Sequence, residues 1–98
     1  MAVVFLTITP LGTGTPSVSR YVAGCERLLR DSGLTHELTA MGTIIEGELD
    51  AILAVVRRMH EHPFSEGAAR VSTFLKIDDR RDKPHTIAGK MRSVREKL

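Results

Sequence analysis

Two kinds of hydrophobic spacing alternate along this 98-residue chain. Apolar residues at every second position, or in β-branched runs, are typical of strands, whereas spacings of three and four are typical of helices. The order of these patterns is strand, helix, strand, strand, helix, strand and a short C-terminal helix. The strand patterns cover 2–9, 35–39, 43–46 and 71–77, and the helix patterns cover 16–32, 49–62 and 87–98.

Proline and glycine mark where the elements are expected to end. Pro10 should stop the first strand and Pro63 should halt the second long helix, because proline has no backbone N–H to donate. Thr15 and Pro16 predict a helix start, with a hydroxyl at the N-cap and proline at the first helical position. Gly33 suits the left-handed cap at the other end. The link at 40–42 predicts a hairpin, and a continuous bent segment is the alternative.

The order of elements matches the split βαβ, or ferredoxin-like, arrangement. We therefore expect an α+β fold: a ferredoxin-like βαββαβ sandwich, with two helices on one face of a four-stranded antiparallel sheet and a short C-terminal helix. The length suits one domain, spanning 1–98. The first strand is apolar on both faces, with Val3 and Phe5 opposite Val4 and Leu6. Since two helices cover only one face, we expect a second copy of the chain to cover the other.

Composition and charge exclude some partners. The formal net charge is +2, and the chain has three Phe, one Tyr and no Trp, so no basic aromatic surface for nucleic acid is expected. No apolar run is long enough for a signal peptide or a membrane span, which predicts a cytoplasmic protein without a membrane partner. The single cysteine, Cys25, lies on the apolar side of the first helix and is interpreted as a structural thiol. The four histidines are scattered, so no metal site is predicted.

Hydroxyl side chains gather around the first turn and the central hairpin. They both donate and accept hydrogen bonds, which suits a small heteroaromatic ring with mixed edges. Each of them is also explained by the preference of threonine for strands. The acidic residue with the most distinctive position is Glu46, at the end of an apolar strand. The turn at 11–17 precedes a helix N-terminus but lacks the dinucleotide fingerprint and the P-loop lysine.

Two motifs are distinctive, Ser-Val-Ser-x-Tyr-Val at 17–22 and Met-Gly-Thr-x-x-Glu-Gly at 41–47. With the segments at 10–23, 67–71, 76–80 and 90–94, they resemble the thiamine-binding, YkoF-like family of small ferredoxin-like proteins, in its one-domain form. The resemblance implies homodimers formed through the sheets, which pair into homotetramers. It implies thiamine, or its hydroxymethylpyrimidine moiety, as a ligand and not as a coenzyme, and no other cofactor. The ligand-binding residues that it suggests are Ser17, Ser19, Thr39, Thr43 and Glu46.

Three hypotheses about function follow. The leading one is an oligomeric small-molecule-binding module for thiamine or its pyrimidine part, which is not an enzyme and has no catalytic residues. The alternative is a regulatory or scaffold protein that acts through protein–protein contacts of its sheet face. The third is a small enzyme in which Glu46 works with His36 or Asp78.

Overall fold

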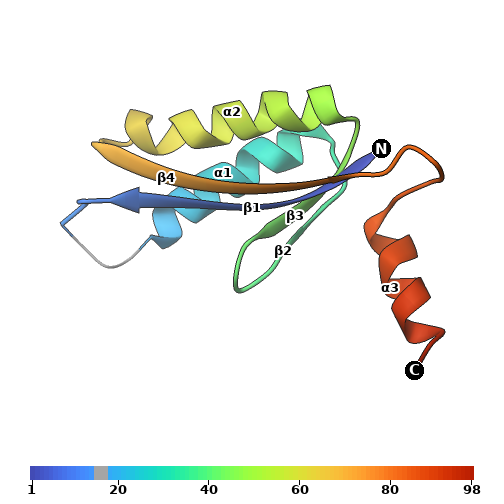
Figure 1. Ribbon diagram of the computed structural model, residues 1–98. Helices are drawn as coiled ribbons and strands as arrows, with labels where there is room; N and C mark the ends of the chain where they lie inside the picture. The colour runs from blue at the N-terminus through green and yellow to red at the C-terminus, as the bar shows by residue number, and fades with distance from the viewer. Residues whose placement is uncertain (15–17) are drawn as a thin grey trace.

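The computed structural model describes residues 1–14 and 18–98, and its elements follow the expected order (Figure 1). All strand pairs are antiparallel, and the order across the sheet is β2-β3-β1-β4. The ferredoxin-like α+β fold predicted from the sequence is confirmed. The strands are β1 (Ala2–Leu11), β2 (His36–Leu38), β3 (Thr43–Gly47) and β4 (Arg70–Asp79), and the helices are α1 (Ser19–Ser32), α2 (Leu49–Ser65) and α3 (Ile87–Arg95).

The core lies between the sheet and the two long helices, which both cover the same face (Figure 1). Val4 and Leu6 of β1 and Ile45 of β3 meet Leu29 of α1 and Ile52 of α2, and each is at most 2% exposed. Burying such a side chain contributes roughly 1.5–3 kcal/mol. Because side chains alternate along each strand, one set faces the helices and the other set lies on the open face of the sheet.

Pro10 does not end β1, contrary to the prediction from sequence. The strand continues to Leu11, and Pro10 lies opposite Val71 of β4. The reason is that β1 pairs with β3 only from Ala2 to Leu6, so its last residues have a partner strand on one side only. A proline is tolerated where the strand has a free edge, because its missing N–H breaks no ladder bond there.

Pro63 does not halt α2 either. The helix runs on to Ser65, with Pro63 inside its last turn. A residue at this position would normally donate its N–H to the carbonyl of Met59, four residues earlier. In the structure the Cys25 thiol of α1 donates to that carbonyl, with Sγ 3.4 Å from the oxygen. The acceptor that Pro63 leaves free therefore has a partner from the neighbouring helix.

The first helix also begins later than predicted. Val18 is not helical and its carbonyl accepts the first helical bonds, from Tyr21 and Val22, so α1 starts at Ser19 and not at Pro16. The predicted cap at Thr15 and Pro16 falls in 15–17, outside the described residues. The other end is as expected, because Gly33 has the left-handed conformation with φ 75°.

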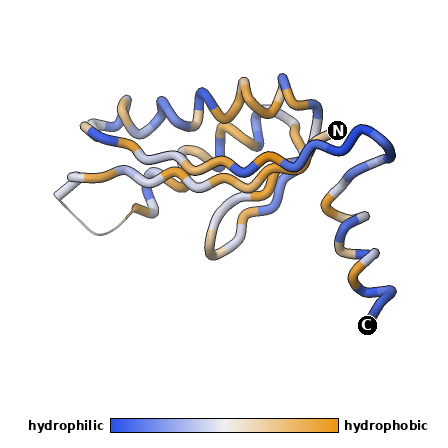
Figure 2. The backbone as a smooth tube through the Cα atoms, in the orientation of Figure 1, coloured by the Kyte–Doolittle hydropathy of each residue, from blue (hydrophilic) through white to orange (hydrophobic). Residues whose placement is uncertain are grey.

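The open face of the sheet is partly covered by the end of the chain itself. Hydrophilic residues follow β4 and lead to α3, which lies on the side away from α1 and α2 (Figures 1 and 2). The Glu46 carboxylate accepts a hydrogen bond from the backbone N–H of Ile87, at 2.8 Å. Thr86 caps the same helix by accepting from Gly89, at 2.9 Å. The Glu46 contact holds the start of α3 at the end of β3, and the Thr86 cap stabilises the first turn of the helix itself.

Candidate functional site

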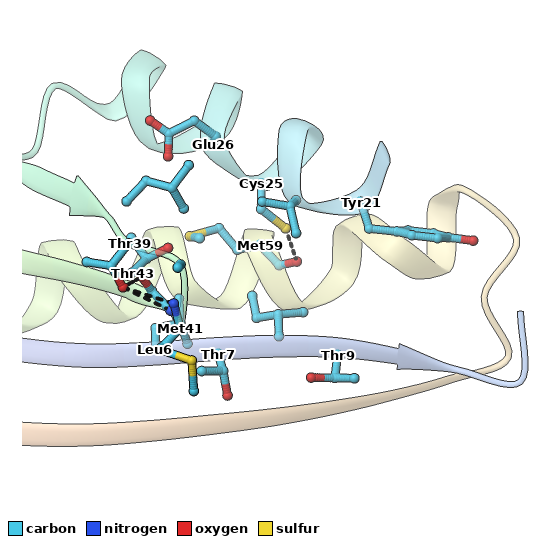
Figure 3. A pocket seen from close by; sticks show the side chains of 15 residues that line it. Leu6, Thr7, Thr9, Tyr21, Cys25, Glu26, Thr39, Met41, Thr43 and Met59 are labelled. Carbon is cyan, nitrogen blue, oxygen red and sulfur yellow. Dashed lines mark hydrogen bonds between the residues drawn. The ribbon is translucent and has the colours of Figure 1, made fainter. Parts of the chain in front are cut away.

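A pocket of about 230 Å³ lies between α1, the β2–β3 hairpin and β1 (Figure 3). The two sequence motifs contribute Tyr21, Val22 and residues 41–43 to its walls. The α1 side also supplies Cys25 and Glu26, the hairpin supplies the rest of 38–43, and β1 supplies 6–9. The volume is below the roughly 300–1,000 Å³ of sites for drug-sized ligands, so the pocket suits a single small ring.

The hairpin turn is shaped by the Thr-Ala-Met-Gly-Thr segment at 39–43. The Thr39 hydroxyl donates to the Gly42 carbonyl at 2.7 Å and accepts from the N–H groups of Met41 and Gly42. A side chain at Gly42 would collide with the Phe5 ring and the Leu6 carbonyl, both under 3.0 Å from an added Cβ. Glycine here lets the turn lie directly on β1. The hairpin pairing also excludes the bent-segment alternative.

The β1 wall has a strand on one side only among the residues that the structure describes. Pairing with β3 stops at Leu6 and Thr43, whereas β1 continues to Leu11 alongside β4 alone. In an antiparallel ladder the N–H and C=O of alternate residues point to the same side. Beyond Leu6, Ile8 therefore directs both its N–H and its C=O toward the side that β3 has left, and Pro10 directs its carbonyl alone, since it has no N–H. Backbone groups at such a strand edge form hydrogen bonds readily.

The α1 wall combines a neutral thiol with a carboxylate. Burial raises the pKa of the Cys25 thiol to about 11, so this group is uncharged at neutral pH. Its neighbour Glu26 is 14% exposed and accepts a 2.8 Å hydrogen bond from Nε2 of His36 on β2. Met59 of α2 closes the inner end of the pocket. The lining therefore mixes apolar side chains with hydroxyls and one carboxylate among the described residues.

The structure brings together two of the five residues selected from sequence. Thr39 and Thr43 line the pocket, with Thr43 buried and the Thr39 hydroxyl engaged in the turn (Figure 3). Ser19 is the exposed first residue of α1 and is not among the lining residues. Ser17 lies outside the described residues. Alternation along β3 places Glu46 on the face opposite Thr43, where its carboxylate contacts α3.

The pair that the enzyme hypothesis needs does not form. His36 contacts Glu26 on α1, and Asp78 forms a 2.9 Å ion pair with Lys90 of α3. The one side-chain bond described for Glu46 is to the Ile87 backbone. No group of three His, Cys, Asp or Glu side chains suited to a metal occurs in 1–14 or 18–98. Within the same ranges, no helix has the length and apolar character that crossing a membrane requires.

Glu26 is the lining residue that the sequence analysis missed. Its neighbours Arg27 and Arg30 indicate the polar side of α1, so the sequence pattern favours a solvent-facing Glu26. It follows Val22 by one helical turn, and Val22 also lines the pocket, so both stand at the border of the apolar stripe. That spacing is a signal in the sequence. The contact with His36, ten residues further on, is a product of tertiary packing and leaves no such signal.

The fold and pocket define a small ferredoxin-like α+β protein with a partly enclosed site between its first helix and central hairpin. A family model described as thiamine-binding protein matches residues 4–95. The UPF0045 protein YqgV of Bacillus subtilis is 46% identical, over 100% of this chain and 98% of its own. A UPF0045 protein of Methanothermobacter thermautotrophicus is 43% identical, over 95% of each chain. The chain therefore belongs to the thiamine-binding protein family, as its motifs predict.

Solved structures agree with this assignment. A hypothetical protein of Methanocaldococcus jannaschii superposes with a TM-score of 0.87 at 39% identity, covering 97% of this chain and 96% of its own. A Thermotoga maritima protein, proposed to act in thiamine biosynthesis or salvage, superposes with a TM-score of 0.78. It is 19% identical and covers 95% of this chain and 97% of its own, and at that identity the likeness concerns the fold.

Proposed function

We propose that this protein binds thiamine through its hydroxymethylpyrimidine moiety, in the pocket between α1 and the hairpin, and does not transform it. The observation that carries the proposal is the place of the pocket. The first three residues of the motif at 41–47 lie in one wall, and the free edge of β1 forms another. A pyrimidine with an exocyclic amino group has donors and acceptors side by side on one edge. Such an edge complements the N–H and C=O of Ile8 and the hydroxyl of Thr43.

The pocket suits thiamine as a ligand better than thiamine diphosphate as a coenzyme. No lysine or arginine is among the described residues that line it. A diphosphate needs cationic side chains or a helix N-terminus to balance its charge. The volume of about 230 Å³ fits one ring, so the thiazolium would extend toward the opening. These features support a role in binding or salvage and give no support to coenzyme chemistry.

Calorimetric titration tests this function. Wild-type protein should bind both thiamine and hydroxymethylpyrimidine saturably. Thr43→Val, which removes a buried hydroxyl at nearly constant volume, should weaken both by about 3- to 10-fold, the range of one neutral hydrogen bond. Thr35→Val is the matched control, because Thr35 is exposed and outside the lining, and it should bind like wild type. Absence of heat and of thermal stabilisation with both compounds would contradict the proposal.

A homodimer through the open sheet faces, and a tetramer built from such dimers, is the second part of the proposal. Phe5 and Phe74 form an edge-to-face pair on this face, with centroids 6.4 Å apart, and Phe74 is 56% exposed. Met91 and Val94 of α3 are also about half exposed. Apolar surface of this kind is typical of an interface. If the chain proved monomeric and bound no small molecule, the face would instead favour the scaffold alternative.

A further inference from the structure

One oxygen of the Glu26 carboxylate has hydrogen-bond partners, and the other has none among the described residues. Oε1 accepts from Nε2 of His36 at 2.8 Å and from Nε of Arg30 at 3.4 Å. Oε2 is buried and has no hydrogen-bond partner among the described residues. A buried carboxylate oxygen without a donor costs free energy, because it has lost its water without a replacement. This atom therefore favours a bound molecule that brings a donor.

The surroundings of Glu26 limit what that donor can be. Glu26 is the only charged residue among the described residues that line the pocket, and it lies above Thr39 and Thr43 in Figure 3. The remaining lining is apolar side chains, hydroxyls and one neutral thiol. A planar ring suits a pocket with such walls, and an N–H group on its edge is the kind of donor that Oε2 lacks. A ring without an N–H donor would leave Oε2 unpaired.

His36 holds the carboxylate in place. Its Nδ1 lies 2.9 Å from the Leu34 carbonyl and its Nε2 lies 2.8 Å from Glu26, so both ring nitrogens face acceptors. Only the imidazolium can donate to both at once. The hydrogen bond to the Leu34 carbonyl is the largest cause that raises the pKa of His36, and Glu26 raises it further, whereas burial and Arg30 oppose them. When protonated, the imidazole balances Glu26 and leaves Oε2 as a hydrogen-bond acceptor.

We propose that Glu26 determines the specificity of the pocket by accepting a hydrogen bond at Oε2 from an amino N–H of an aminopyrimidine, and that His36 is its positioning residue. This inference rests on the proposed function and names the ligand group that the site selects. The ligand must combine a flat apolar ring with an N–H donor at its edge, and an aminopyrimidine has both. The same ring without the amino group is the discriminating competitor.

The test compares two ligands on matched variants. Hydroxymethylpyrimidine and its analogue without the amino group are titrated into wild type, into Glu26→Met and into Glu61→Met, an exposed glutamate of α2 that serves as the control. Wild type should prefer the amino compound by about 10- to 100-fold, the range for a hydrogen bond to a charged group. Glu26→Met should remove most of this preference and Glu61→Met should keep it. Should Glu26→Met fail to fold, Glu26→Gln should show a smaller loss in the same direction.

The outcomes separate the two proposals. If wild type binds neither compound, the proposed function fails and the inference falls with it. If wild type binds both, and Glu26→Met weakens them equally or not at all, the inference alone is overturned.

The pH dependence of ligand affinity tests the positioning role of His36. His36 is charged below its raised pKa and loses its proton as pH rises, so affinity for the amino compound should fall by about 3- to 10-fold between pH 6 and 9. The groups that face His36 are Glu26 and Arg30 of α1 and the Leu34 carbonyl, and the Cys25 thiol in the same wall stays neutral over this range. His36→Gln, which can donate but does not titrate, should flatten the profile. An equally steep profile in His36→Gln would overturn the role.

Discussion

Cys25 and Glu26 are adjacent on α1, but their side chains contact different elements of the fold. The Cys25 thiol donates to the Met59 carbonyl of α2, which receives no hydrogen bond from Pro63 because proline has no N–H. Glu26 lies at the border of the apolar stripe, where it meets His36 and the pocket. In both cases a polar atom is buried with a partner that comes from another element. At the scale of single residues, the site is built from contacts that the local sequence pattern does not contain.

The thiol of Cys25 should be nearly inert in the folded protein. Its pKa is raised to about 11 by burial, so the reactive thiolate is scarce at pH 7.5, and the side chain is 7% exposed. Labelling with a thiol-specific disulfide reagent should be slow in buffer and complete within seconds in denaturant. The reaction should accelerate with pH only in strongly alkaline buffer. Rapid labelling of the native protein at neutral pH would contradict this account of the thiol.

Among the elements, α3 has the weakest attachment to the rest of the fold. None of its residues is buried, and the contacts at its start are the Glu46 and Thr86 caps and the Lys90–Asp78 ion pair. Its apolar side, with Met91, lies beside Val3 and Ile44 at one end of the open face. A helix of nine residues depends on such caps and on packing, because its own backbone bonds are marginal.

Glu46→Ala should therefore loosen α3. The Ile87 amide would lose its acceptor, and amide hydrogen exchange at the start of the helix should become about 5-fold faster, since a cap of this kind contributes about 1 kcal/mol. Exchange in α1 and α2 should not change.

The same variant tests the ligand-binding role that the motif predicts for Glu46. Weaker thiamine binding with unaltered exchange in α3 would assign Glu46 to the ligand and not to the helix.

The order of elements could be predicted from sequence because hydrophobic periodicity is local. The errors came at Pro10 and Pro63, because the cost of a proline depends on which partner its N–H would have had. Pro10 lies on a free strand edge, and the acceptor opposite Pro63 is occupied by Cys25. In the site, Thr39 and Thr43 come together because one turn holds both. Glu26 follows Val22 by one helical turn, which is a signal in the sequence, but its contact with His36 of another element leaves none.

At the scale of the whole molecule, the account requires that copies of the chain cover the open face. Phe74→Asp should reduce the assembly to monomers, because it puts a charge into the proposed sheet-to-sheet contact. Phe64→Asp is the matched control, an exposed aromatic of α2 on the helix side, and should keep the wild-type mass. Light scattering coupled to size exclusion measures both. An unaltered mass for Phe74→Asp would remove this face from the interface.

The central claim is that the pocket between α1 and the hairpin holds the pyrimidine ring. A crystal structure of the protein with hydroxymethylpyrimidine tests it most directly. The account predicts the ring between Thr43 and Met59, with its amino group at Oε2 of Glu26 and its polar edge along the free side of β1. A ring bound on the open face beside Glu46, with the pocket closed by its own side chains, would contradict it.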